Sequence, residues 1–216
     1  GINRINLSLD TIDQNKYKKI TRFGDLNKVL AGIEKALENN IKIKINCVAL
    51  KNFNEGEFFS IIEWANKLKI DLSFIEVMPM MDTDIARHLQ YLPLNKVFDE
   101  LNKNFNFYKL EKNTGGPARY YSSENLSINI GFISPITNNF CNNCNRIRIS
   151  STGKLYMCLG QNEFIDFKQI MRNDYNDDFI KEKIKFALKI KPLKHDFIVE
   201  KNSKPYMQRH MNVTGG

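Results

Sequence analysis

The chain has 216 residues, which is long enough for one sizeable hydrophobic core or for a core with a smaller appended unit. Hydrophobic residues make up 42% and charged residues 26%, a balance that indicates a soluble globular protein. No apolar run approaches the roughly 18 residues of a membrane span, so we expect a cytoplasmic protein without a membrane partner. The net charge of +8 is compatible with a phosphorylated substrate, a nucleic acid or an anionic surface, and does not choose among them.

The first residues, Gly1 to Leu7, have a strand pattern with no initiator methionine and no signal peptide, so we expect the sequence to be part of a longer protein. Strands and helices then alternate. Strands of this kind are parallel, with right-handed crossovers. Three such strands cannot close a barrel but are compatible with its second half. The predicted strands cover Arg4–Leu9, Ile41–Leu50 and Leu72–Val77, and the predicted helices cover Asp25–Asn39 and Glu55–Lys69.

The second part of the chain has a different pattern of elements. After a predicted helix over Leu94–Phe105, a flexible turn at Thr114–Pro117 leads into a hairpin-like pair over Tyr120–Ile133. We therefore predict an α/β fold with a partial parallel barrel over residues 1–92 and an α+β domain over residues 93–216. The remaining predictions are strands over Arg146–Ser150 and Lys154–Met157 with a turn at Thr152–Gly153, a helix over Phe179–Ile190, and a polar extended segment over Tyr206–Gly216.

Three of the four cysteines lie close together in sequence. Cys141 and Cys144 have the Cys-x-x-Cys spacing of metal ligands, and Cys158 follows after thirteen intervening residues. The predicted turn at Thr152–Gly153 folds Cys158 back towards the first pair. A structural zinc site requires four ligands, so zinc would need a distant His or Asp. A 4Fe–4S cluster held by three cysteines would leave one iron open to another ligand, and the spacing alone leaves both alternatives open.

The residues around these cysteines make the pattern more specific. The segments Phe140–Arg148 and Gly153–Leu159 closely resemble the C-terminal cluster segment of the GTP 3′,8-cyclase family, which reads Phe-Cys-x-x-Cys-Asn-Arg-x-Arg followed by Gly-x-Leu-x-x-Cys-Leu. The resemblance extends over the whole chain. Further similar stretches occur in the same order at Arg4–Asp10, Lys42–Asn46, Phe74–Pro79 and the terminal Gly215–Gly216.

The resemblance implies a radical S-adenosylmethionine (SAM) lyase of molybdenum cofactor biosynthesis. It implies the second half of a radical SAM barrel followed by an iron–sulfur domain, with a parent enzyme that converts GTP to 3′,8-cyclo-7,8-dihydro-GTP through a 5′-deoxyadenosyl radical. The family's Cys-x3-Cys-x2-Cys motif does not occur here, since no cysteine precedes Cys47. We therefore expect the parent to hold a second 4Fe–4S cluster served by a reductant, and this chain alone to be inactive. A homodimer is one expected assembly, and nucleic acid is not an expected partner.

The resemblance also assigns roles to residues. It implies one 4Fe–4S cluster in this chain, with GTP and SAM as the small-molecule partners. A non-catalytic zinc or iron–sulfur module that binds a nucleotide or a nucleic acid is the alternative. The implied residues are Cys141, Cys144 and Cys158 for the cluster; Lys44, Arg146, Ile147 and Arg148 for GTP; Ser8, Asn46 and Met78 for SAM; and Gly215 and Gly216 as a catalytic tail that enters the active site.

Strand periodicity adds expectations about where side chains point. Arg146 and Arg148 alternate on a predicted strand and should share one face. Lys44 and Asn46 should share a face near the carboxyl end of their strand, where ligands gather in parallel barrels. Cys47 should point the other way, as a buried structural thiol. Ser73 is a departure, since members of the family often have Arg there.

Overall fold

A computed structural model describes residues 1–78, 87–112, 114–173, 176–195, 197 and 213–214. The chain divides into two compact units. The first comprises Gly1–Val77 and Gln90–Asn139, and the second comprises Met78–Leu89 and Phe140–Gly216. The expected domain boundary after residue 92 does not coincide with this division, because a strand from residues 130–133 pairs with the sheet of the first unit. Among the described residues, no helix is long and apolar enough to cross a membrane.

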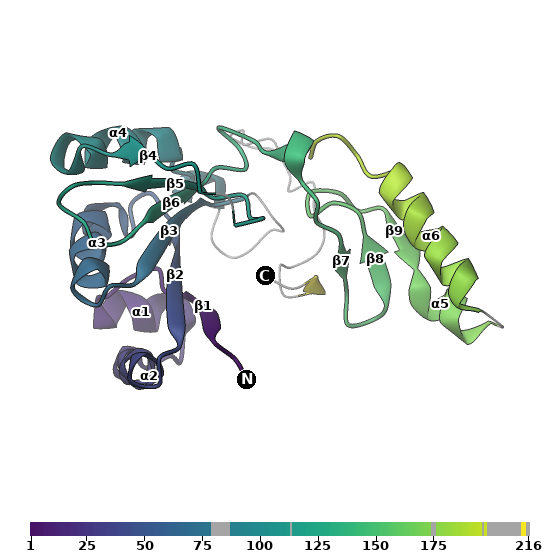
Figure 1. The fold of residues 1–216 in the computed structure, drawn as a ribbon, viewed down its shortest axis with the longest axis horizontal. Helices are drawn as coiled ribbons and strands as arrows, with labels where there is room; N and C mark the ends of the chain where they lie inside the picture. The colour runs from purple at the N-terminus through teal and green to yellow at the C-terminus, as the bar shows by residue number, and fades with distance from the viewer. Residues whose placement is uncertain (79–86, 113, 174–175, 196, 198–212, 215–216) are drawn as a thin grey trace. The chain divides into compact units, whose positions relative to one another are not determined.

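The first unit is built on a six-stranded mixed sheet in the order β1-β2-β3-β6-β5-β4 (Figure 1). The first four strands in this order run parallel, and β5 and β4 are antiparallel additions. The parallel strand–helix–strand pattern and the hairpin-like pair are therefore confirmed. The strands are β1 Arg4–Ser8, β2 Lys42–Ala49, β3 Asp71–Glu76, β4 Tyr108–Lys109, β5 Arg119–Ser122 and β6 Ile130–Ile133.

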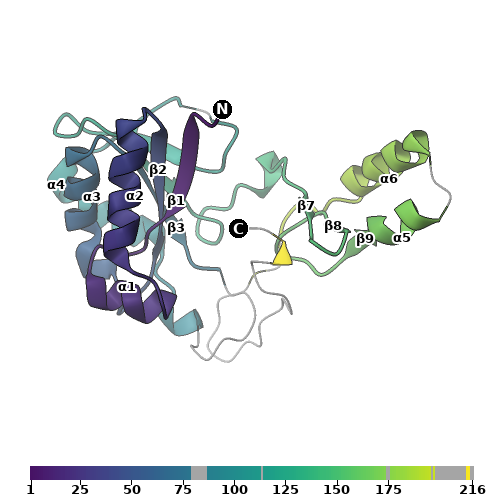
Figure 2. The same ribbon diagram turned by 90° about the horizontal axis from the view of Figure 1, so that it is seen from below.

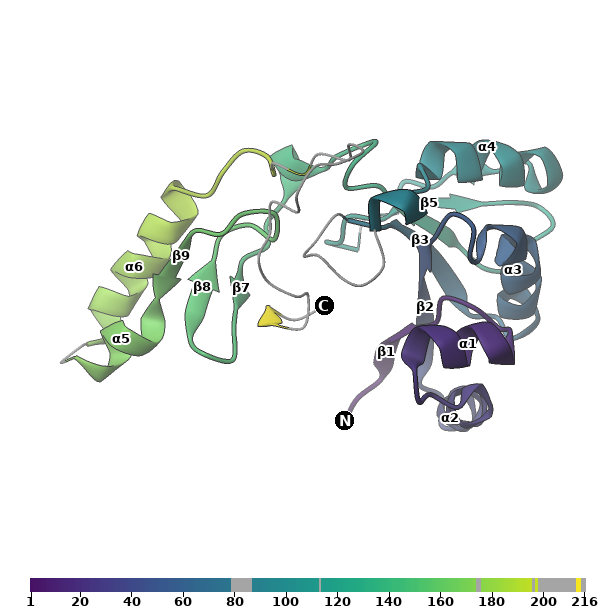
Figure 3. The ribbon, with the colours of Figure 1, turned by 180° about the vertical axis from the view of Figure 1, so that it is seen from behind.

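All four α-helices of this unit cover the same face of the sheet (Figures 1 and 3). Three of them were predicted, because each has an apolar stripe that packs on the strands. The fourth, α1, was missed because none of its residues is buried, and its first turn is fixed instead by a hydrogen bond from Lys16 N to Asp13. The helices are α1 Gln14–Thr21, α2 Leu26–Glu38, α3 Phe58–Lys67 and α4 Leu94–Phe105, with a short 3₁₀ turn η1 Glu55–Glu57. A second 3₁₀ turn, η2 Arg87–Gln90, spans the division between the two units.

The hydrophobic core lies between the helices and one face of the sheet. Along β2, buried and partly exposed residues alternate strictly, so Ile45 and Cys47 face the core while Lys44 and Asn46 face away from the helices. An aromatic group continues this core across the sheet, with ring centroids 5.8 Å apart for Phe74 and Phe132. This burial confirms that Cys47 points away from the face expected to bind ligands.

The second unit contains a three-stranded antiparallel sheet beside two helices (Figure 2). Its buried core is small and consists of Leu155, Met157, Phe167 and Ala187. The predicted hairpin with its turn at Thr152–Gly153 is present, but its first strand begins at Arg148 rather than Arg146. Strand β9 and helix α5 were not predicted because both are short. The elements are η3 Cys141–Asn143, β7 Arg148–Ile149, β8 Lys154–Tyr156, β9 Phe164–Asp166, α5 Phe167–Arg172 and α6 Asp177–Lys189.

Candidate functional site

A row of small and polar residues crosses the sheet face that the four helices leave uncovered. In the strand register, Ser8 lies opposite Asn46, Asn46 opposite Ser73, Ser73 opposite Gly131, and Gly131 opposite Tyr120. We call these five residues the polar row. It joins Ser8 and Asn46, two residues predicted from the sequence to share a ligand. It also adds Ser73, Gly131 and Tyr120, which the sequence did not single out as ligand residues.

Two buried oxygen atoms in the polar row lack a hydrogen-bond partner among the described residues. They are Asn46 Oδ1 and Ser73 Oγ, on neighbouring strands of the same face. A buried polar group without a partner costs about 1–3 kcal/mol, and such groups are usually paired. An amide oxygen and a hydroxyl are suited to amino and hydroxyl groups of a small ligand. The donor set of this face therefore fits a polar ligand such as SAM.

Lys44 lies one step along the same face, between Asn6 on β1 and Asp71 on β3. Its side chain crosses the face, and Lys44 Nζ donates a hydrogen bond to Tyr120 Oη at 3.0 Å. The expected location near the carboxyl end of the strand was wrong, because β2 continues to Ala49 and Lys44 is the third of its eight residues. The site thus lies over the middle of β2 rather than at its tip.

The lack of a side chain at Gly131 leaves room for Tyr120 to meet Lys44. A Cβ atom at residue 131 would lie inside the contact distance of Ser73 Oγ and 3.2 Å from Cε1 of Tyr120. The Tyr120 side chain therefore passes directly over Gly131, and Ser73 occupies the adjoining space. Small residues at positions 73 and 131 therefore let the Tyr120 side chain lie close to the sheet.

Met78 is not joined to this group by the described contacts. It follows β3 by two residues, is partly exposed, and is grouped with the second compact unit, whereas Ser8 and Asn46 belong to the first. The role predicted for Met78 in SAM binding stays a prediction.

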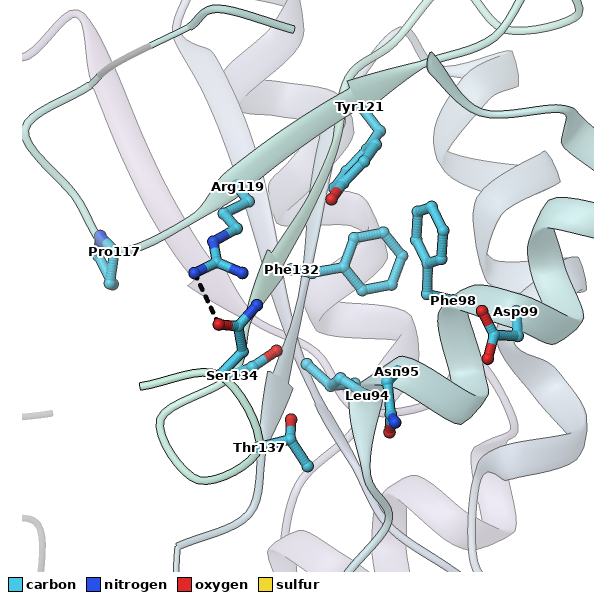
Figure 4. A pocket seen from close by; sticks show the side chains of 11 residues that line it. Leu94, Asn95, Phe98, Asp99, Pro117, Arg119, Tyr121, Phe132, Ser134 and Thr137 are labelled. Carbon is cyan, nitrogen blue, oxygen red and sulfur yellow. Dashed lines mark hydrogen bonds between the residues drawn. The ribbon is translucent and has the colours of Figure 1, made fainter. Parts of the chain in front are cut away.

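A well-formed pocket of the first unit lies on the opposite, helix-covered side of the sheet (Figure 4). It has a volume of about 220 Å³ and lies between α4 and the β5–β6 hairpin. Arg119 closes one side and donates a hydrogen bond to Asn138 Oδ1 at 2.8 Å. Tyr121, which points to the side opposite Tyr120, lines its apolar part. None of the residues predicted to bind a ligand lines this pocket.

The three clustered cysteines all belong to the second unit. Cys141 and Cys144 are the two ends of a tight turn, in which Cys144 N donates to Cys141 O at 3.0 Å. The predicted β7–β8 hairpin is present, and Cys158 follows it by two residues. Burial raises the pKa of the Cys158 thiol, and the charges of Cys141 and Cys144 raise it further, while the Gly160 N–H and the Lys191 charge act in the opposite direction.

The second unit also brings cationic side chains to these thiols. Burial lowers the pKa of the Arg148 guanidinium, the Arg146 charge lowers it further, and interaction with Cys144 and Cys158 opposes both. Arg148 is thus near both thiols. Arg146 precedes β7, so the expected strand alternation does not fix its direction, while Ile147 between them packs against the small core.

Lys191 is a central residue of this site that the sequence analysis missed. Its ammonium donates hydrogen bonds to the carbonyl oxygens of Met157 at 2.6 Å and Arg146 at 2.9 Å, and it lies 3.9 Å from Cys144 Sγ. Arg146 is one of the arginines of the motif, and Met157 directly precedes Cys158. Lys191 comes from a lysine-rich run, so no feature of the sequence distinguished it from its neighbours.

No ready-made single-ion site is present in the described part of the chain. There, no group of three His, Cys, Asp or Glu side chains is gathered in a way that could hold one metal ion. The fit of an iron–sulfur cluster therefore depends on the donors themselves. Three cysteine thiols on one hairpin and its flanking turn, beside the cations of Arg148 and Lys191, are the ligand chemistry that such a cluster uses.

The predicted catalytic tail, Gly215 and Gly216, lies outside the described residues. Thr214, directly before it, is described and buried. Arg148 donates a hydrogen bond from Nη1 to the Thr214 carbonyl oxygen at 3.4 Å. Thr214 Oγ1 is also buried, without a hydrogen-bond partner among the described residues. The residue that leads into the tail thus contacts one of the arginines of the cysteine motif.

The sheet of parallel strands with helices on one face, in the first unit, is consistent with part of a radical SAM fold. The Radical SAM superfamily profile matches residues 1–65. The profile of the family described as Molybdenum Cofactor Synthesis C matches residues 70–197, which is more than half of the chain. The chain therefore belongs to the molybdenum cofactor synthesis family.

Curated relatives agree with this assignment. Three proteins named GTP 3′,8-cyclase are similar over 100% of this chain: those of Nitrobacter winogradskyi at 45% identity, Brucella ovis at 44%, and Rhizobium leguminosarum bv. trifolii at 46%. The chain spans 62–63% of the length of these relatives.

Proposed function

We propose that this chain is the part of a GTP 3′,8-cyclase that binds GTP and one 4Fe–4S cluster. The observation that carries the proposal is Lys191, whose ammonium lies 3.9 Å from Cys144 Sγ and donates to the carbonyl oxygen of Met157, next to Cys158, within the residues that match the family profile. The parent enzyme would convert GTP to 3′,8-cyclo-7,8-dihydro-GTP in molybdenum cofactor biosynthesis. The relatives' names and their identity over the whole chain support this reading.

The first unit would contain the second half of a radical SAM barrel, over residues 1–92, together with strands β4 to β6 from residues 93–216, the range in which the iron–sulfur domain would lie. The uncovered face of the first unit's sheet would hold SAM through Ser8 and Asn46, with Met78 as a further contact. The unpartnered oxygen of Asn46 supports this assignment, because it is already buried and needs a donor. When cleaved, SAM supplies a 5′-deoxyadenosyl radical. The reductant and the cluster that cleave SAM would belong to the remaining part of the parent.

In the second unit, Cys141, Cys144 and Cys158 would hold the cluster. When bound, it supplies an open iron that a purine nitrogen or oxygen can ligate. Arg146 and Arg148 would bind GTP through their guanidinium groups, which match phosphate and purine oxygens. Ile147 would fix their spacing by packing on the core. Lys44, which belongs to the first unit, would also bind GTP.

The Gly215–Gly216 tail would enter the active site. Support comes from Thr214, whose carbonyl oxygen accepts a hydrogen bond from Arg148. A dipeptide without side chains can approach a ligand closely. We further propose a cytoplasmic enzyme, with a homodimer as one assembly, in which this chain alone does not catalyse the reaction.

Anaerobic reconstitution of the chain with iron and sulfide tests the cluster. We expect about four irons per chain, as for one 4Fe–4S cluster. The Cys144→Ser variant should lose most of this iron. The Cys47→Ser variant is a matched control and should retain it, since Cys47 lies in the core of the other unit. Stoichiometric zinc without sulfide would contradict the assignment and favour a zinc module.

A measurement of GTP affinity on the reconstituted chain tests the proposed nucleotide site. We expect Arg148→Ala to weaken GTP binding by about 1–3 kcal/mol, as for the loss of a charged hydrogen bond. The exposed Arg172 at the end of α5 provides the control, and Arg172→Ala should bind GTP like the unmodified chain. Equal GTP affinity in Arg148→Ala and the unmodified chain would remove Arg148 from the site.

A further inference from the structure

A second lysine approaches Tyr120 from the segment between β4 and β5. Lys112 Nζ lies 5.0 Å from the centre of the Tyr120 ring, and Lys44 Nζ lies 5.3 Å from the same centre. Lys44 comes from β2 and Lys112 from 68 residues further along the chain. Two ammonium groups from distant segments thus converge on one buried aromatic side chain, which is 3% exposed.

The two ammonium groups are held in different ways. Lys44 donates to the phenolic oxygen of Tyr120 at 3.0 Å, which orients it over the polar row. Lys112 forms an ion pair with Asp71 at 3.2 Å, and its side chain remains 38% exposed. Asp71 is already engaged by the backbone N–H and the side-chain amide of Asn129. The Asp71 carboxylate is therefore shared, and the two lysines leave positive charge beside the uncovered face.

The electrostatics of Tyr120 agree with this excess of positive charge. Burial alone would raise the pKa of the phenol. The hydrogen bonds from Lys44 and Thr114, together with the charges of Lys44 and Lys112, outweigh burial and lower it. The surroundings of this phenol thus favour negative charge, which a bound anion would also bring.

We propose that Tyr120 and Lys112 complete, together with Lys44, an anion subsite on the uncovered sheet face that holds a phosphate group of the nucleotide. This inference rests on the proposed function, because it takes a nucleoside triphosphate as the ligand. Lys112 is the second cation of the subsite. Tyr120 is a positioning residue, which acts by fixing the Lys44 ammonium while its ring supports Lys112.

Binding of inorganic tripolyphosphate to the 216-residue chain tests the subsite without the base or the ribose. Isothermal calorimetry should show that Lys112→Gln weakens tripolyphosphate binding about five- to tenfold, and that Lys112→Arg restores most of it. Tyr120→Phe keeps the ring but removes the acceptor, and should weaken binding about three- to tenfold. Lys109→Gln is the matched control, since Lys109 pairs with Tyr121 on the other side of the sheet and is 62% exposed.

A variant of Asp71 separates this role from a purely structural one. Asp71→Asn keeps an acceptor for Asn129 but removes the charge that competes for Lys112, so tripolyphosphate should bind more tightly. If Lys112 serves only to pair with Asp71, binding would not change. Circular dichroism of each variant verifies its fold, and the partial exposure of Lys112 makes its replacement well tolerated.

Different experimental outcomes would contradict the subsite and the proposed function. If tripolyphosphate binds and shows this mutational pattern while GTP binds no more tightly than tripolyphosphate, the subsite stands and guanine recognition fails. If the unmodified chain does not bind tripolyphosphate, or if Lys112→Gln and Tyr120→Phe bind it like the unmodified chain, the subsite is overturned. Iron content and guanosine binding then test the proposed function separately.

Discussion

At the scale of single residues, the four cysteines have two different environments. Cys47 is fully buried in the core of the first unit, and burial raises the pKa of its thiol well above the usual value, with the charges of Asp10 and Glu57 adding to the effect. The thiolate is the reactive form, so a raised pKa leaves less of it at a given pH. Cys141 and Cys144 are partly exposed.

We expect a maleimide reagent at pH 8 to modify Cys141 and Cys144 first, Cys158 more slowly, and Cys47 only after denaturation. Mass spectrometry of the intact, metal-free chain over time measures the number of modified thiols. Labelling in denaturant is the control and should reach all four cysteines. Modification of Cys47 at the rate of Cys141 in the native chain would show that the core described here is wrong.

Replacing Gly131 most directly tests the close approach of Tyr120 and Ser73 to this residue. A methyl group at this position meets Ser73 Oγ and the Tyr120 ring, so Gly131→Ala should destabilise the first unit by about 1–3 kcal/mol. Urea unfolding measures the change. Ser73→Gly in the same chain should recover part of the loss.

Gly32 provides the matched control for this substitution. Nothing lies within 4 Å of a Cβ at this position in α2, so Gly32→Ala should stabilise the chain by about 0.5–1 kcal/mol. Equal effects of the two substitutions would contradict the close approach at Gly131.

At the scale of elements, one buried carboxylate fastens α4 and the segment after β6 to the end of β3. Glu76 accepts hydrogen bonds from the Leu94 backbone at the first turn of α4, from the backbone of Ile136, and from the backbone and hydroxyl of Thr137. A carboxylate at a helix N-terminus also interacts favourably with the helix dipole. Three backbone N–H groups would lose their partner without it.

We therefore expect Glu76→Ala to destabilise the first unit by about 3–5 kcal/mol, as when one partner of a buried charged network is removed. Denaturant unfolding measures this loss. The exposed Glu63 on α3 is the control, and Glu63→Ala should change stability by less than about 0.5 kcal/mol. A small effect of Glu76→Ala would mean that water replaces the carboxylate.

Because of the same carboxylate, we expect the folding stability to depend on pH. Burial, the charge of Glu76 and the hydrogen bond to Glu76 raise the pKa of Tyr91 to about 12. The protonated phenol is thus favoured in the folded chain, so its stabilising contribution is complete below about pH 10 and is lost as the pH rises towards 12. Thermal unfolding between pH 9 and pH 12 should show a steeper loss of stability in the unmodified chain than in Tyr91→Phe. Parallel curves would exclude this role.

Whether the sequence predicts an element depends on which interaction stabilises that element. Helices α2, α3 and α4 bury an apolar stripe, so their periodicity shows them directly. Helix α1 has no fully buried residue, packs only Tyr17 partly against the core and begins at the Asp13 cap, so it has no apolar stripe to reveal it. The cysteine spacing predicts a metal site because the three cysteines are close in sequence, and this stays a prediction. Lys191 and Tyr120 reach the two candidate sites through contacts across 34 to 76 residues, which no local pattern encodes.

At the scale of the whole molecule, the two compact units have cores of very different size. The core of the first unit includes most of its strands and helices, whereas the core of the second has four buried hydrophobic residues among those that the structure describes. A core of that size stabilises a fold weakly, and small units of this kind commonly depend on a bound metal.

We expect the metal-free chain to unfold in two steps, with the second unit first, and reconstitution with iron and sulfide to stabilise the second unit selectively. Hydrogen exchange followed by mass spectrometry should show low protection in α6 and high protection in α3 before reconstitution. After reconstitution, protection in α6 should increase while that in α3 stays the same. Loss of protection in both helices at one denaturant concentration would contradict independent units.

The first unit also contains a natural optical label. Trp64, the single tryptophan of the chain, lies on α3 and packs half-buried against the larger core. Its emission therefore reports on the environment of the first unit alone. During a two-step unfolding, tryptophan fluorescence would remain native-like through the first step and change only in the second. Comparing it with far-ultraviolet dichroism, which sees α6 as well, would separate the two units in the unlabelled chain.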